Sequence, residues 1–128
     1  MNKTVCVAGA SGLVGSSIVK AALSRGYSVN GTLRDATIKD KAEYLHQLEG
    51  ATNLKLFSAD MQRGSDFDEA LSGTDAVFIA CLIPTYKGPT GIAAKEMEYD
   101  QGYREIIQPT VDGCMEILKA AHKQGLRK

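Results

Sequence analysis

Three glycines, Gly9, Gly12 and Gly15, recur at every third position after the apolar residues 5–8. Glycines at this spacing form a turn so tight that the phosphates of a dinucleotide can approach the backbone. The free N–H groups at the start of a following helix favour their negative charge. The alternative is a tight connection between strand and helix that holds no ligand. The residues that we predict to line the site are Gly9, Ser11, Gly12, Leu13, Val14 and Gly15.

A guanidinium follows the second apolar stretch, where Arg34 precedes Asp35. A carboxylate at this position accepts a hydrogen bond from the ribose 2′-hydroxyl of NAD, whereas a 2′-phosphate is repelled by a carboxylate and favours a guanidinium. Because Arg34 comes first and Lys39 and Lys41 can add further positive charge, we predict a preference for NADP(H) over NAD(H). The alternative is that Arg34 is solvated and that Asp35 selects the cofactor.

Two further groups of residues stand where the third and fourth apolar stretches end. Asp60 can accept from the adenine amino group while Met61 packs on the ring, unless Asp60 only caps a turn. Ala80, Cys81 and Leu82 leave room for the ribose of the cofactor to lie across the end of the strand. Nothing in the sequence supplies a base for Cys81, so we do not predict a nucleophilic thiol.

The overall composition narrows the possible partners. Lys plus Arg and Asp plus Glu both number 15, so the net charge of zero gives no attraction for nucleic acid or an anionic membrane. No apolar run is long enough to span a bilayer, and no secretory leader precedes the first strand, so we expect a cytoplasmic protein. The histidines and cysteines form no catalytic or metal-binding set: His46, His122, Cys6, Cys81 and Cys114.

Stretches of strand type alternate with stretches whose apolar residues recur at helical spacing. This alternation predicts an α/β fold, a three-layer Rossmann-type domain whose parallel sheet has the order 3-2-1-4. We expect one domain over residues 1–128, with Pro109 bending the last helix or setting its start. The expected strands are 3–8, 27–33, 54–59 and 76–83, and the expected helices are 12–24, 39–49, 66–71 and 99–123.

Five separate segments carry the pattern of a known family, and together they are more specific than the glycines alone. They are Val-Ala-Gly-Ala-Ser-Gly-Leu-Val-Gly at 7–15, Gly-Thr-Leu-Arg-Asp at 31–35, Leu-Glu-Gly-Ala at 48–51, Ala-Asp-Met at 59–61 and Ile-Gln-Pro-Thr-Val-Asp-Gly at 107–113. Over nearly its whole length the chain resembles the N-terminal half of the extended short-chain dehydrogenases/reductases. Within that family it is similar to the dihydroflavonol reductase and cinnamoyl-CoA reductase group.

The resemblance implies a reductase that transfers a hydride from NADPH to an aldehyde or ketone. It implies that Arg34 contacts the 2′-phosphate, with Lys41 as the assisting lysine, and that Asp60 and Met61 border adenine. The segment 79–84 is about one residue longer than the family's pattern, which puts the contacts on the nicotinamide side in doubt.

The family's catalytic Ser or Thr and its Tyr-x-x-x-Lys pair have no counterpart in residues 1–128, because none of the five tyrosines is followed by a lysine four positions later. We therefore expect a domain truncated before strand 5, with no catalytic residue of its own. The alternatives are a non-catalytic nucleotide-binding or scaffold subunit of a larger assembly, and a fragment of an ordinary enzyme. Without strand 5 the apolar fourth strand has an unpaired edge, which we expect a second copy, another protein or a continuation of the chain to cover.

Overall fold

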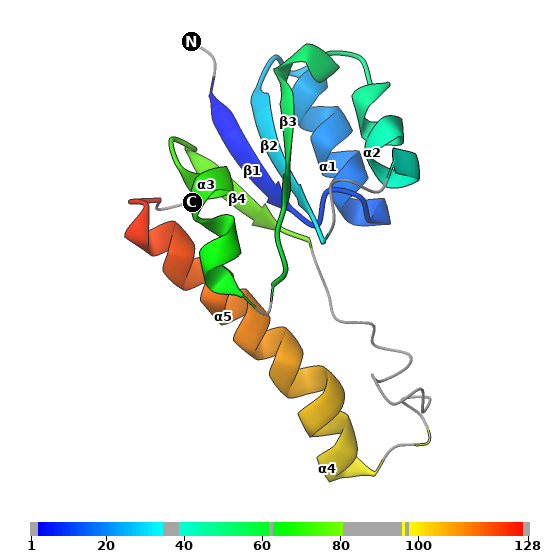
Figure 1. Cartoon of the computed structure of the whole chain (residues 1–128), viewed down its shortest axis with the longest axis vertical. Helices are drawn as coiled ribbons and strands as arrows, with labels where there is room; N and C mark the ends of the chain where they lie inside the picture. The colour runs from blue at the N-terminus through cyan, green and yellow to red at the C-terminus, as the bar shows by residue number, and fades with distance from the viewer. Residues whose placement is uncertain (1–2, 35–38, 62, 81–95, 97, 127–128) are drawn as a thin grey trace.

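A four-stranded parallel sheet forms the centre of the computed structural model (Figure 1), which describes residues 3–34, 39–61, 63–80, 96 and 98–126. The strands lie in the order β3-β2-β1-β4, which confirms the predicted order. Parallel strands need crossover connections, and each connection between successive strands contains a helix. The strands are β1 (Thr4–Ala8), β2 (Ser28–Leu33), β3 (Leu54–Ser58) and β4 (Ala76–Ile79).

Helices cover both faces of the sheet, so the predicted three-layer arrangement is confirmed (Figure 1). Helices α1 and α2 pack on one face, and α3 and α5 pack on the other. The helices are α1 (Leu13–Ser24), α2 (Lys39–His46), α3 (Asp68–Leu71), α4 (Tyr99–Gly102) and α5 (Gln108–Lys123). Three shorter turns join them, the 3-10 turns η1 (Ala51–Asn53) and η2 (Gly64–Phe67) and the π-helical turn η4 (Tyr103–Ile107).

Strand β1 is buried on both faces, which explains why its sequence is continuously apolar. Val5 and Val7 belong to the cluster under α1 and α2, whereas Cys6 and Ala8 belong to the cluster under α3 and α5. The largest buried helical residues on the two faces are Val19, Leu23 and Leu45 on the first, and Phe67, Leu71 and Ile117 on the second. The strand that leads into the glycine turn is therefore held from both sides.

The last helical segment is continuous but not uniform. The helical backbone runs from α4 through the π turn η4 into α5, which begins at Gln108, next to Pro109. Proline has no N–H to complete the bond to the carbonyl four residues earlier, so regular α-helical bonding is interrupted at this point. The prediction that the regular helix starts near Pro109 is confirmed.

Three further predicted elements differ from those observed, the first being the helix expected at 39–49, which ends at His46. The helix expected at 66–71 is divided into η2 and α3, because Gly64 allows the chain to begin turning two residues earlier and against α5. The fourth strand was expected to reach residue 83, but β4 ends at Ile79, and residues 81–95 lie outside the described part of the chain. No helix within the described ranges combines the length and the apolar character that crossing a membrane requires.

Candidate functional site

Of the predicted site residues that the structure describes, those of the glycine turn, Arg34, Asp60 and Ala80 lie at one edge of the sheet, where all four strands have their carboxyl ends. Ala8 at the end of β1 is in register with Thr32 of β2 and with Ile79 of β4, and Leu33 is in register with Ser58 of β3. The helices α1 and α5, which come after β1 and β4 in the chain, pack on opposite faces of the sheet. A crevice at such a switch point is where ligands bind in open parallel sheets.

The glycine turn follows β1 at this edge, and its backbone is closely packed. Gly9 has a φ of 84°, a left-handed conformation that favours glycine. The N–H of Gly12 donates to the carbonyl oxygen of Gly9 (3.3 Å), which closes the turn. A Cβ at Gly15 would overlap that same carbonyl oxygen, so only glycine allows α1 to pack this closely on the turn.

The N-terminus of α1 is open to a ligand. Its N-cap residue is Gly12, no side chain caps it, and no acidic residue lies in its first turn. The first N–H groups of a helix have no acceptor within the helix, so those of Leu13 and Val14 are available to an anion. These two side chains are 87% and 63% exposed, which is unusual for large apolar residues and leaves them free to pack against a bound molecule.

Arg34 follows β2 directly and is exposed beside the glycine turn. The strand end that carries it is fixed, because the N–H of Ala59 donates to the carbonyl oxygen of Leu33 (2.8 Å). A guanidinium here can reach a phosphate without first breaking a buried contact. Asp35 lies outside the described residues, and the structure describes the backbone of Lys41 in α2 but not its side chain.

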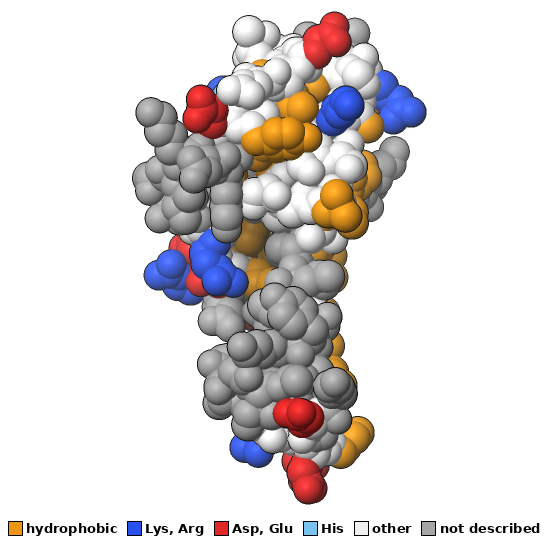
Figure 2. Space-filling model, turned by 90° about the vertical axis from the view of Figure 1, so that its right-hand side faces the viewer, with side chains coloured by type: hydrophobic (Ala, Val, Ile, Leu, Met, Phe, Trp, Pro, Cys, Tyr) orange, Lys and Arg blue, Asp and Glu red, His pale blue; other side chains and the backbone are white. Residues whose placement is uncertain are grey.

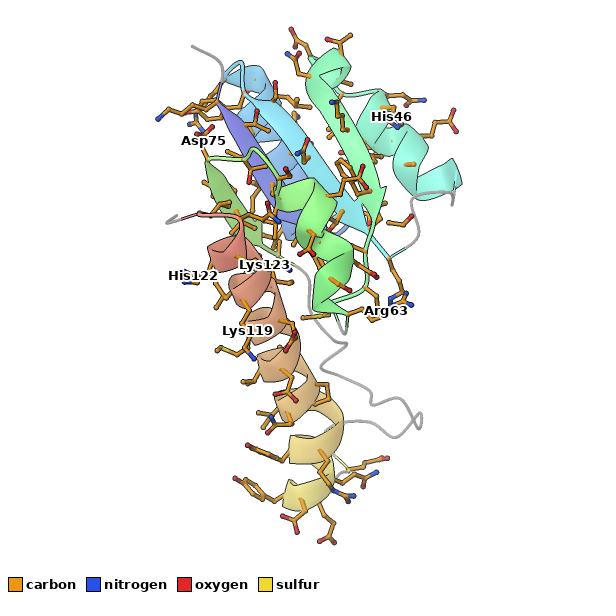
Figure 3. All side chains as sticks on the ribbon, turned by 60° about the vertical axis from the view of Figure 1, so that its left-hand side comes forward. His46, Arg63, Asp75, Lys119, His122 and Lys123 are labelled. Atoms are coloured by element: carbon orange, nitrogen blue, oxygen red, sulfur yellow. The ribbon has the colours of Figure 1, made fainter. Side chains whose placement is uncertain are left out.

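The chain after β3 turns sharply around Asp66. The carboxylate of Asp66 accepts from the N–H of Asp60 (3.2 Å) and pairs with the Nε of Arg63 (3.3 Å), whose side chain is labelled in Figure 3. Asp60 is half-buried, whereas Met61 is only 7% exposed and packs in the core against Gly113 of α5. The structure therefore brings Asp60 to the edge but directs Met61 at α5, and their contacts with adenine stay predictions.

At the end of β4, the N–H of Ala80 donates to the carbonyl oxygen of Ala8 (2.9 Å), which places Ala80 beside the glycine turn. Cys81 and Leu82 lie outside the described residues. Within the part of the chain that is described, no group of histidine, cysteine and acidic side chains could hold a metal ion. His46 and His122 are exposed, as predicted, and lie on α2 and α5, far from one another (Figure 3).

One residue at this edge was not among the predicted site residues. Thr32 is 1% exposed, and its Oγ1 accepts a hydrogen bond from the N–H of Gly9 (3.2 Å), while its carbonyl oxygen accepts one from the N–H of Ala10 (2.8 Å). It therefore ties the end of β2 to the glycine turn. The available sequence signal was a hydroxyl near the end of the second strand, but its partner lies 23 residues away.

Comparison with known proteins connects this chain to a class of ligand. A family model described as NAD(P)H-binding matches residues 9–128. Dihydroflavonol 4-reductase of Dianthus caryophyllus is 38% identical over 127 residues, which cover 98% of this chain and 32% of that protein. The (2S)-flavan-3-ol-forming anthocyanidin reductase of Vitis vinifera is 35% identical over 118 residues, which cover 92% of this chain and 32% of that protein.

Among solved structures, vestitone reductase from alfalfa (Medicago sativa L.) superposes with a TM-score of 0.64 at 33% identity, over 91% of this chain and 31% of that one. The yeast methylglyoxal/isovaleraldehyde reductase Gre2, in complex with NADPH, has the same fold at 23% identity, with a TM-score of 0.67 over 94% of this chain and 33% of that one. The chain therefore spans about a third of the length of the curated relatives that it matches.

Proposed function

The chain belongs to the NAD(P)H-binding family, and from this premise we propose that it binds NADP(H) in preference to NAD(H) at the carboxyl edge of its sheet. The glycine turn and the uncapped N-terminus of α1 hold the pyrophosphate, at the backbone of Gly12, Leu13 and Val14. Asp60 accepts from the adenine amino group, and the ribose next to the nicotinamide lies across Ala80.

The observation that carries the NADP(H) preference is the exposed guanidinium of Arg34 at the end of β2. A 2′-phosphate adds about two negative charges to the adenosine ribose, and a planar guanidinium binds such a group through paired hydrogen bonds. The alternative is that Asp35 binds the 2′-hydroxyl of NAD, in which case its carboxylate would repel the 2′-phosphate.

Titration of the purified chain with NADPH and NADH, followed by calorimetry, tests this preference. We expect Arg34→Gln to lower the affinity for NADPH at least about tenfold, since charged hydrogen bonds contribute roughly 1.5–3 kcal/mol. We expect the affinity for NADH to stay nearly unchanged. Arg25→Gln is the matched control, because Arg25 is exposed at the opposite end of α1, about 18 Å along the helix. Equal losses for the two nucleotides would contradict the preference.

We further propose that the domain serves a reductase that transfers a hydride to an aldehyde or ketone, as the names of its relatives suggest. The alternative is a non-catalytic nucleotide-binding or scaffold subunit of a larger assembly. Sequencing of the transcript past codon 128 separates the two. A continuation that encodes this pair supports the reductase, and a stop codon supports the binding module.

We also propose that the edge beside β4 is covered in the functional protein by a second copy, by another protein or by a continuation of the chain. Among the described strands β4 pairs only with β1, and its Phe78 is 43% exposed. A hollow of about 460 Å³ beside it is lined by Val5, Tyr27 and Leu126 among others. A row of exposed apolar side chains also follows the outer face of the last helical segment: Tyr99, Tyr103, Ile107, Val111, Met115 and Leu118.

Hydrophobic side chains also reach the surface on the side of the molecule that Figure 2 turns toward the viewer. Sedimentation equilibrium tests whether the exposed apolar surface leads to association. We expect the chain to self-associate at micromolar concentration and Phe78→Glu to shift it toward monomer; a monomeric wild-type chain would leave another protein or a continuation of the chain to cover this edge. We also propose a cytoplasmic location, which the free cysteines Cys6 and Cys114 support because a reducing compartment keeps thiols free. Microscopy of a fluorescent fusion checks that location.

A further inference from the structure

Thr32 stands apart from the other polar residues of this protein. Among the described residues it is the one polar side chain that is buried, at 1% exposure. Its Oγ1 accepts from the N–H of Gly9 at 3.2 Å, across 23 residues of sequence. A buried polar group is normally retained with its partner, because an unpaired donor or acceptor away from water is costly. The pair therefore constrains the backbone of the glycine turn.

Gly9 is the residue of the turn whose orientation matters most. The carbonyl oxygen of Gly9 accepts a hydrogen bond from the N–H of Gly12 and lies close to the Cα of Gly15. Gly9 has a φ of 84°, which is kept only while the peptide group that carries its N–H keeps its orientation. Glycine by itself rotates easily, so it does not hold this conformation without help. The hydroxyl of Thr32 supplies that help by fixing the N–H of Gly9, which in turn fixes the direction of the N–H groups that follow.

Thr32 also lies two residues before Arg34, which directly follows the same strand, about 7 Å further along the chain. Thr32 is thus hydrogen-bonded to the glycine turn, where we propose that the pyrophosphate binds. It also belongs to the strand end that leads to Arg34, where we propose that the 2′-phosphate binds. We propose that Thr32 is a positioning residue that holds these two halves of the dinucleotide site at a fixed separation, an inference that rests on the proposed NADP(H) site. It acts through Gly9 and not by touching the ligand.

Replacement by Val tests this role, since Val keeps the size and branching of Thr and suits a strand but cannot accept a hydrogen bond. Thr32→Val lowers the affinity for NADPH about tenfold, as expected for the loss of one buried hydrogen bond at the site. The affinity for adenosine 2′-monophosphate, which carries no pyrophosphate, changes less than about twofold. Thr32→Ser keeps the acceptor and restores most of the NADPH affinity.

Hydrogen exchange of the unliganded chain, followed by NMR, gives a readout that needs no nucleotide. In Thr32→Val the amide of Gly9 loses protection about tenfold or more, because its acceptor is gone. The amide of Ala10 is the internal control, because it donates to the backbone carbonyl oxygen of Thr32 at 2.8 Å and keeps its acceptor in the variant. A general loosening of the fold would expose both amides equally.

The outcomes are distinguishable. If the wild-type chain binds no NADPH while Gly9 alone loses protection in Thr32→Val, the proposed function fails and the hydrogen bond to Gly9 stands without a role in binding. If Thr32→Val binds NADPH as tightly as the wild type, the positioning role is overturned. The positioning role is also overturned if Thr32→Val lowers the affinities for NADPH and for adenosine 2′-monophosphate equally. It is likewise overturned if Thr32→Ser lowers the affinity for NADPH as much as Thr32→Val does.

Discussion

Gly15 and Gly12 of the same turn differ in the space around them, because a Cβ would clash with backbone atoms at Gly15 but not at Gly12. Replacing each by alanine therefore separates an effect on folding from an effect on nucleotide binding. A Cβ at Gly15 would overlap the carbonyl oxygen of Gly9 and lie 2.8 Å from its carbonyl carbon and 3.2 Å from Ala10 Cα. All three are backbone atoms, which cannot rotate away. A Cβ at Gly12 would meet only the Gly9 oxygen at 3.6 Å, an ordinary contact, and its φ of −73° suits any residue.

The size of the Gly15→Ala effect follows from these distances. Nonbonded carbons prefer about 3.5–4.0 Å, so α1 must move from the turn by about 1 Å. Its buried residues Val19, Ala22 and Leu23 move with it. Overpacking of this kind costs up to about 3 kcal/mol, and the higher helix propensity of alanine offsets about 1 kcal/mol of it. We therefore expect Gly15→Ala to lower the free energy of unfolding by about 2 kcal/mol, or Tm by about 8 °C.

Urea denaturation followed by circular dichroism measures this change. We expect Gly12→Ala to alter the free energy of unfolding by only about 0.5 kcal/mol, because its Cβ has space, although glycine is the better N-cap. Its Cβ nevertheless stands where the pyrophosphate approaches, so the affinity for NADPH falls while the fold remains. If Gly15→Ala proves as stable as Gly12→Ala, the close approach of α1 to the turn is not what requires glycine, and the reasoning is refuted.

Two further substitutions test the turn after β3 and its packing on α5. Asp66→Ala removes the acceptor for the N–H of Asp60, so we expect a loss of about 1 kcal/mol in urea denaturation, against no significant change for the exposed control Glu43→Ala. Gly113→Ala places a Cβ 2.5 Å from Met61 Cε and 3.3 Å from its carbonyl oxygen, so we expect a loss of about 1–2 kcal/mol. Combined with Met61→Ala, its cost should be smaller than alone, and simple additivity would contradict this contact.

Much of the fold could be predicted because its signals are local. The apolar run of β1 and the helical spacing in α1 follow from periodicities that neighbouring residues display by themselves. The strand order then followed from the handedness of parallel crossovers. The division of the helix at 66–71 was not predicted, because it depends on how closely Gly64 packs against Glu116 of α5.

The sequence by itself determined which kind of site is predicted, because the glycine spacing and the cation after the second strand are properties of short segments. It also determined that Gly9, Arg34 and Asp60 lie at one edge of the sheet, since the carboxyl ends of parallel strands share that edge. Only the tertiary structure decided that Met61 packs under Gly113 and that Thr32 holds Gly9. These contacts join residues far apart in the chain, and their distances depend on how helix and strand pack, which no local pattern specifies.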